Sequence, residues 1–328
     1  GTAGSGGSDG VFRVGNSLSF TRAQLDQFKF SYSSATYSSL QLSDGELVPG
    51  VTGATGFVNV RITNSGTTNG SWSTVSGTAT FVPSANNATI NITDIYTHLY
   101  NNTVNVTINT VLASGTQVGQ VDINNAVTGD LNSNNNRTLT MNANGDINVN
   151  QSITLASSAN SNINYTTHSL VLNSTTGSIN ILSPISTQRI TGSGNQIWYS
   201  YSGTSGSITM SAPLGTIYAS VSGTLNTSGT VNGNGAAYDG AAGAISLSSM
   251  GFRILSTITA TSRYNAAQYG NISITNTGTS VTSGGGVNDG ISGVITGKNF
   301  TKAGVGSLKL SGNNGWNGTT TISGGTLQ

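Results

Sequence analysis

The chain has 328 residues but no cysteine, only two histidines and only four prolines. The lack of cysteine excludes a disulfide framework and a thiolate metal site. Only 11 basic and 10 acidic residues are present, and the net charge of +1 gives no electrostatic reason to expect nucleic acid or an anionic membrane as a partner. There is no run of 18 apolar residues, so we expect no helix that crosses a bilayer. The first residue is Gly1 rather than Met, which predicts a mature or excised fragment.

What the chain does contain is glycine, asparagine, serine and threonine, which together make up about half of it, far above average usage. Such a bias can indicate disorder. Here, however, valine, isoleucine and leucine recur at alternate positions along most of the length. Alternation of apolar and short polar residues is typical of half-buried strands, so the sequence predicts an all-β protein.

A five-residue pattern, Gly-x-Ile-x-apolar, recurs through the middle of the chain. It begins at Gly145, Gly177, Gly206, Gly243 and Gly270, with spacings of 32, 29, 37 and 27 residues. Spacings in this range indicate a repeat architecture. Because the turns vary in length while the strands are kept, the pattern favours a right-handed parallel β-helix over a propeller. The residues expected to stack inside it, coil on coil, are Ile147, Val149, Ile179, Ile181, Ile208 and Met210.

The first part of the chain has a different character. We assign residues 1–56 to a flexible segment and an N-terminal cap or accessory β layer, and residues 57–328 to the β-helix, which we expect to continue beyond the fragment. Strands are expected at 57–62, 79–82 and 88–92. Residues 21–30 form the one credible helical turn, with Thr21 as its N-cap. A cap is expected because the end of a coil exposes an unpaired sheet edge.

The last stretch carries the most specific pattern. Strand-like alternation is punctuated by glycines from Lys302 to the end of the chain. The positions that carry the pattern are Gly306, Leu308, Leu310, Gly312, Asn314, Trp316, Gly318, Thr320, Ile322, Gly325 and Leu327. This segment resembles the autotransporter-associated β-strand repeat.

A second, broader similarity runs over residues 85–185, where Val104-Asn-Val-Thr-Ile108 is followed by Gly119-Gln-Val-Asp-Ile123. This region resembles the large secreted adhesins related to filamentous haemagglutinin. Together the two resemblances imply a parallel β-helix on the surface of a Gram-negative bacterium. They also imply an outer-membrane translocator that lies outside this fragment.

Candidates for catalysis or metal binding are few. His98 and His168 lack an evident triad, so we interpret both as polar wall or loop residues. Asp122, Asp130 and Asp146 would serve a carbohydrate-active site only if the coils aligned them, and turn capping is the favoured interpretation. Asn232 begins a single, incomplete match to a calcium-binding repeat, and Thr257, Thr259 and Thr261 form one short outward row. We therefore predict no enzyme activity, no cofactor and no metal.

Two aromatic residues are the candidate ligand-binding positions. Trp198 and Tyr218 each alternate with inward apolar residues, and exposed aromatic rings suit carbohydrate. Packing beneath an inserted loop is an equal alternative. The sequence thus predicts a non-catalytic surface adhesin or stalk that contacts a glycan or protein of a host or neighbouring cell. One alternative is a subunit of a self-assembling filament, with copies joined end to end, and another is a β-helical enzyme acting on carbohydrate.

Overall fold

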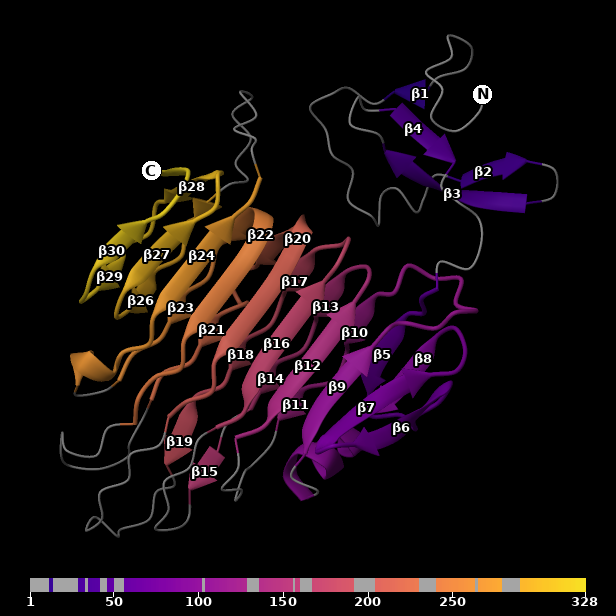
Figure 1. Cartoon of the computed structure of the whole chain (residues 1–328), viewed down its shortest axis with the longest axis horizontal. Coiled ribbons are helices and arrows are strands. Elements are labelled where there is room, and N and C mark those ends of the chain that lie inside the picture. Colours follow the sequence, from indigo (N-terminus) through magenta and orange to yellow (C-terminus); the bar gives the residue numbers. More distant parts are fainter. Residues whose placement is uncertain are drawn as a thin grey trace.

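The computed structural model describes residues 12–13, 29–32, 35–41, 46–49, 56–101, 104–128, 136–155, 157–159, 167–191, 204–229, 240–262, 265–278 and 290–328. Within these residues the protein is mostly β, and most of its strands pair in parallel (Figure 1). No helix among them is long and apolar enough to span a membrane.

Successive strands distribute over three parallel ladders, which we call faces one, two and three. Face one consists of β7 (Thr78–Pro83), β9 (Asn105–Asn109), β12 (Thr138–Ala143), β16 (Ser169–Ser174), the first half of β20 (Ile208–Ala219), the first half of β22 (Ile245–Ile254), β24 (Ile272–Asn276), β27 (Phe300–Ala303) and β30 (Thr320–Ile322). Face two consists of β8 (Ala88–Asn91), β5 (Val60–Thr63), β10 (Val121–Ile123), β13 (Ile147–Val149), β17 (Ile179–Ile181), the second halves of β20 and β22, β25 (Gly290–Ile291), β28 (Ser307–Leu310) and β31 (Thr326–Leu327).

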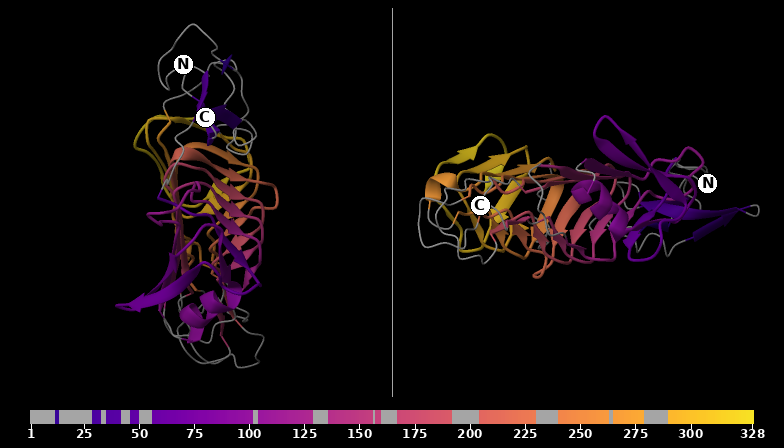
Figure 2. Two further views of the ribbon diagram at one scale, coloured as in Figure 1. Left: turned by 90° about the vertical axis from the view of Figure 1, so that its right-hand side faces the viewer. Right: turned by 90° about the horizontal axis from the view of Figure 1, so that it is seen from below.

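Face three is made of short strands that complete each coil. They are β11 (Val127–Thr128), β14 (Ile153–Thr154), β18 (Ile185–Ser186), β21 (Leu225–Asn226), β23 (Ile258–Thr259), β26 (Ile295–Gly297) and β29 (Gly315–Trp316). A separate pair, β15 (Ser157–Ala159) and β19 (Arg189–Thr191), is also parallel. From β9 onward the chain visits faces one, two and three in turn, and the strands follow one another in sequence order (Figure 2). This arrangement is consistent with a β-solenoid.

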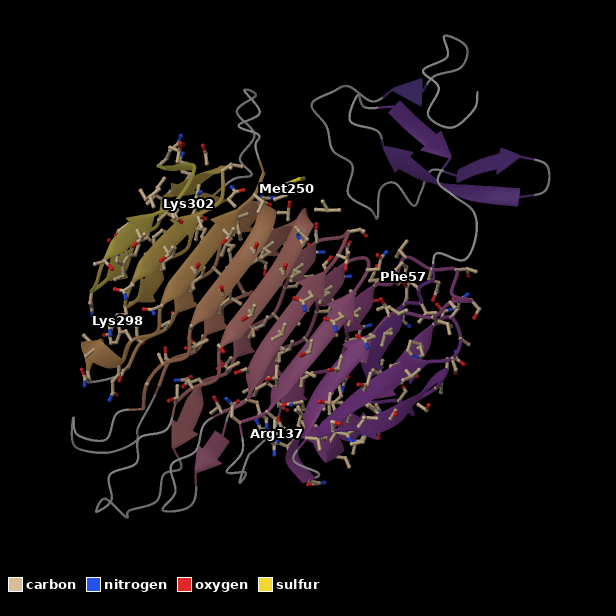
Figure 3. All side chains as sticks on the ribbon, viewed as in Figure 1. Phe57, Arg137, Met250, Lys298 and Lys302 are labelled. Atoms are coloured by element: carbon tan, nitrogen blue, oxygen red, sulfur yellow. The ribbon has the colours of Figure 1, made fainter. Side chains whose placement is uncertain are left out.

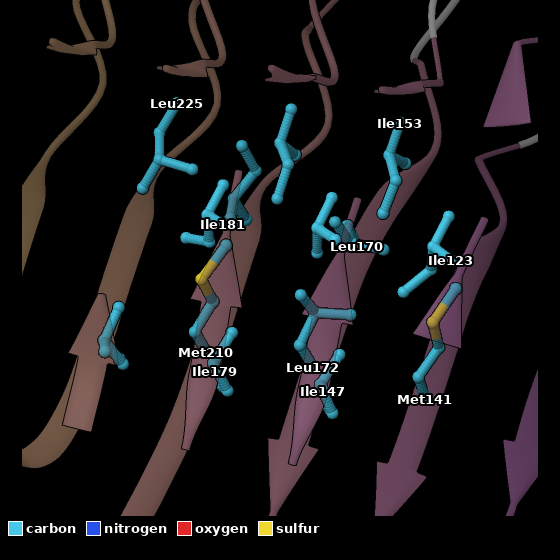
Figure 4. Packing of buried hydrophobic residues seen from close by; sticks show 14 of the residues in the cluster. Ile123, Met141, Ile147, Ile153, Leu170, Leu172, Ile179, Ile181, Met210 and Leu225 are labelled. Atoms are coloured by element: carbon cyan, nitrogen blue, oxygen red, sulfur yellow. The ribbon is translucent and has the colours of Figure 1, made fainter. Parts of the chain in front are cut away.

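Alternation of side chains explains why these segments are strands. In β12 and β16 every second residue is buried, because successive side chains of a strand point to opposite sides. Parallel register then stacks like positions directly on one another. On face one this produces the inward ladder of Ile108, Met141, Leu172, Met210, Leu247, Ile274, Lys302 and Ile322. Its members from Ile108 to Lys302 are at most 1% exposed. Figure 4 shows its members Met141, Leu172 and Met210.

The predicted inward residues are confirmed as buried, but one predicted stacking order is wrong. Ile179 and Ile181 stack on Ile147 and Val149, as expected. Ile208 and Met210 instead lie on face one, where they pair with Leu170 and Leu172. The glycine pattern therefore crosses from face two to face one between Gly177 and Gly206. Both faces present the same Gly-x-Ile-x-apolar strand, so the pattern alone does not distinguish them.

The N-terminal edges of the ladders end in antiparallel segments. On face one, β6 (Gly70–Val75) pairs antiparallel with β7 through a tight turn at Ser76 and Gly77, both of which have positive φ. On face two, Thr68 forms an antiparallel bridge to Thr89 of β8. These segments cover edges that would otherwise template further strands. The edge covering thus comes from residues within 57–328, the part that the sequence assigns to the β-helix.

A short helical segment takes the place of a strand between β8 and β9. The α-helix α2 (Ile92–Tyr96) continues into the π-helical turn η1 (Thr97–Asn101). The side chain of Asn91 caps the helix by accepting the Thr93 N–H at 2.8 Å. Ile92, Ile95 and Leu99 point into the core. The sequence analysis did not predict this helix, because its apolar spacing is short and follows a strand directly. One 3₁₀ turn, η3 (Ala266–Gln268), precedes β24.

The described residues between 12 and 49 form a four-stranded antiparallel sheet of β1 (Phe12–Arg13), β4 (Glu46–Pro49), β3 (Ala35–Gln41) and β2 (Lys29–Tyr32). The predicted helical turn at 21–30 is wrong at its end, where Lys29 and Phe30 belong to β2. Residues 21–28 lie outside the described residues. Assignment of residues 1–56 to a cap, and the boundary at residue 57, stay predictions.

Candidate functional site

The outer wall of face two carries a continuous row of polar side chains. In register, Arg61, Asp122, Asn148, Asn180, Tyr218 and Arg253 follow one another from coil to coil. Asn148 donates to the Asp122 carboxylate at 2.8 Å, and Asn180 donates to Asn148 at 2.8 Å. This amide chain fixes the side chains without burying them fully.

Tyr218 lies in this row, half-buried and outward, between buried Ile217 and Ala219. The Arg253 guanidinium lies over its ring, 5.6 Å from the centroid. The ring is therefore part of the outer wall. Its use as a ligand platform stays a prediction. Trp198, the other candidate, lies outside the described residues.

The carboxylates considered for catalysis have structural partners. Asp122 accepts from Gln120 at 2.6 Å as well as from Asn148. Asp146 accepts the backbone N–H of Ser178, one coil further on, at 2.7 Å. This bond agrees with the turn-capping interpretation, except that the donor belongs to the next coil. Asp130 lies outside the described residues.

The remaining motifs give no metal site in the described part of the chain, where no group of three His, Asp or Glu side chains is close enough to hold an ion. Asn232 lies outside that part. Thr257, Thr259 and Thr261 do point outward, alternating with buried Ile258 and Ala260.

The two histidines make separate aromatic contacts, and His168 lies at the corner that leads into face one. We call the residues around His168 the histidine corner and define it as Tyr100, Arg137 and His168. Trp72 contacts His98 with ring centroids 4.6 Å apart, and Tyr100 stacks on His168 at 5.3 Å. Arg137 lies immediately before β12 (Figure 3). The histidine corner thus joins the η1 turn to two successive coils.

His168 lies in the connection just before β16, as the loop interpretation has it, but it is fully buried. Its Nδ1 accepts the Arg137 backbone N–H at 3.0 Å. Burial, assisted by the nearby Arg137 guanidinium, lowers the pKa of His168 to about 4. Burial also lowers the pKa of His98, although Asp94 opposes the shift. Both imidazoles are therefore neutral near pH 7.

A second buried polar group, Lys302, was missed by the sequence analysis. It occupies an inward position of face one, between Ile274 and Ile322, and is 0% exposed. Its ammonium donates to the carbonyl oxygens of Ala303, Gly304 and Gly324 at 2.8–2.9 Å. All three ammonium protons are thereby used. The signal was present in the sequence, since Lys302 falls in phase with Phe300 in an otherwise apolar alternation.

Comparison with known families agrees with the pattern at the C-terminal end. The model of the passenger-associated-transport-repeat matches residues 300–328. The chain therefore carries a repeat that is typical of autotransporter passengers, as its resemblance to the autotransporter-associated β-strand repeat predicted. Neither the curated proteins nor the solved structures include a significant match.

Proposed function

We propose that this chain is a segment of an autotransporter passenger, a right-handed parallel β-helix that is displayed on the surface of a Gram-negative bacterium as a non-catalytic adhesin or stalk. The observation that carries the proposal is the passenger-associated transport repeat at 300–328. Its strands β27 and β28 pair in parallel with β24 and β25 of the preceding coils. The repeat is thus built into the same ladders as the rest of the structure.

The composition of the outer walls supports contact with another surface. The outward row of face one is almost entirely hydroxyl-bearing: Thr107, Thr140, Val171, Thr209, Ser246, Ser273, Thr301 and Thr321. Face two adds the amide row and Tyr218. Uncharged hydroxyls, amides and an aromatic ring match the groups of a glycan or a polar protein surface. We propose a host or neighbouring-cell glycan or protein as the partner.

Adhesion can be tested with the purified full chain immobilised on beads. Beads should bind cultured epithelial cells or matrix glycoproteins saturably. The double variant Tyr218→Ala, Arg253→Gln should bind about tenfold more weakly, because it removes the aromatic platform and the guanidinium over it. Lys309→Gln, on the same face, is the matched control and should bind normally. Absence of saturable binding to every cell type and glycoprotein tested would contradict the adhesin role.

The filament alternative stays a prediction and has a separate test. Sedimentation velocity over a wide range of protein concentration should give one monomeric species for an adhesin segment. Growth of the sedimentation coefficient with concentration would favour end-to-end assembly instead. Enzyme activity also remains to be tested, by polysaccharide turnover with the Asp122→Asn and Asp146→Asn variants.

A further inference from the structure

The histidine corner contains an unusual concentration of unpartnered polar atoms. Five buried side-chain polar atoms lack a hydrogen-bond partner in the described part of the chain, and three of them belong to this corner: Tyr100 Oη, Arg137 Nε and His168 Nε2. A buried donor that is left without a partner is destabilising, so most folded proteins avoid it. A bound ligand that accepts their hydrogen bonds would remove this cost for several such atoms at once.

The unpartnered atoms are hydrogen-bond donors. Nδ1 of His168 accepts a hydrogen bond from the Arg137 backbone N–H, so the neutral imidazole carries its hydrogen on Nε2. Arg137 Nε can only donate. Burial raises the pKa of Tyr100, which keeps its hydroxyl protonated. The corner therefore offers donors and a positive charge.

These donors belong to residues that touch. His168 contacts Arg137 through its Nδ1 and Tyr100 through ring stacking. A single water molecule can accept two hydrogen bonds, whereas a carboxylate has about four acceptor positions and also neutralises a guanidinium. Tyr100 and Arg137 are part-exposed, so the corner reaches the surface, while its three unpartnered polar atoms are themselves buried. Tyr96, 5.4 Å from Tyr100, extends the aromatic surface on the same helical segment.

We propose that Tyr100, Arg137 and His168 form a binding site for the carboxylate of an acidic sugar, with the sugar ring against Tyr96 and Tyr100. The three donors, one of which belongs to the Arg137 guanidinium, bind the carboxylate, and the aromatic rings select a sugar over a small anion. This site goes beyond surface adhesion and is separate from the Tyr218 wall. Its failure would leave the bead-binding experiment unaffected.

The site can be tested by NMR titration of the labelled full chain with D-glucuronate. The chain has two histidines, and the His98→Gln variant assigns the Hε1 signal of His168. Glucuronate should shift that signal saturably. The neutral methyl ester of glucuronate should bind at least about tenfold more weakly, because it lacks the negative charge. Arg137→Gln should weaken glucuronate binding to a similar extent, while Arg61→Gln, an exposed arginine on face two, should leave it unchanged.

A second measurement separates a ligand site from ordinary hydration. Tyr100→Phe removes only an unpartnered hydroxyl, so it should raise the thermal midpoint of the free protein and weaken glucuronate binding. A lower midpoint would mean that water satisfies the hydroxyl, and would overturn the proposal. Equal binding of acetate and glucuronate would mean an adventitious ion only. Tighter binding of a tetraglutamate peptide would point to an acidic protein partner, and no saturable shift would exclude the site altogether.

Discussion

The middle coils (104–278) and the terminal repeat (300–328) build the same ladders by different means. Along the inward ladder of face one, neighbouring positions are 37 residues apart between Met210 and Leu247, but only 20 apart between Lys302 and Ile322. The middle coils keep their strands in register while the connections vary. The terminal repeat has no room for such variation, because its turns are fixed by glycines. Gly304 and Gly325 both have positive φ, and a Cβ on Gly325 would overlap the carbonyl oxygen of Gly306.

The two regions also treat a buried polar group differently. In the terminal repeat the Lys302 ammonium uses all of its protons on carbonyl oxygens of two successive coils. In the middle coils His168 is equally buried, yet its Nε2 has no partner. A buried polar group whose hydrogen bonds are all made can hold two coils together. A buried polar group without a hydrogen-bond partner lowers the free energy of unfolding unless a ligand binds it. The difference agrees with a structural role for Lys302 in the repeat and with the binding site proposed at the histidine corner.

The largest effect is expected from truncating the inward ladder. Leu172→Ala should reduce the free energy of unfolding by about 2–5 kcal/mol, because a buried leucine leaves a cavity between two coils. Ile322→Ala in the terminal repeat should cost less than about 1 kcal/mol, since Ile322 is already 52% exposed. Urea unfolding followed by circular dichroism measures both. Equal losses would show that the two regions do not differ in packing.

The second largest effect is expected from acidification, which should lower the stability of the protein mainly through the histidine corner. Unfolded histidine has a pKa of 6.5, whereas that of His168 in the folded protein is about 4. Above pH 6.5 both states are neutral and stability is unaffected. As pH falls from 6.5 to 4, His168 takes up a proton in the unfolded state but stays largely neutral in the folded state. The free energy of unfolding should therefore drop by about 3 kcal/mol.

The control for this pH effect is His168→Gln, which removes the titrating group. Its stability should vary much less over the same pH range, with His98 contributing a smaller remainder in the same direction. Urea midpoints at pH 7.5, 6, 5 and 4 give the comparison. An identical pH profile in the variant would place the acid sensitivity elsewhere in the chain.

Much of the fold could be predicted from the sequence, because alternation determines which side chains point inward whatever the length of the connections. Which face each strand belongs to could not be predicted, since Gly177 and Gly206 begin similar strands on different faces. The α2 helix was hidden because its apolar residues continue directly from β8. The histidine corner depends on contacts between residues 31 or more positions apart, such as Arg137 with His168 and Tyr100 with His168, which spacing does not reveal. Lys302 was visible as an interruption of the apolar pattern, but its carbonyl partners come from the fold.

The smallest predicted effect is also the sharpest test of the comparison. Lys302→Met places an apolar side chain of similar length in the inward ladder, so this position becomes apolar like those of the middle coils. The substitution also leaves the carbonyls of Ala303, Gly304 and Gly324 without their donor. We expect a loss of about 1–3 kcal/mol, visible as faster amide hydrogen exchange in residues 300–328 and unchanged exchange in the middle coils. Lys309→Met, an exposed position in the same repeat, should have little effect. If Lys302→Met instead leaves the free energy of unfolding unchanged or raises it, burial of the charge costs at least as much as its hydrogen bonds contribute. The ammonium would then not stabilise the contact between coils.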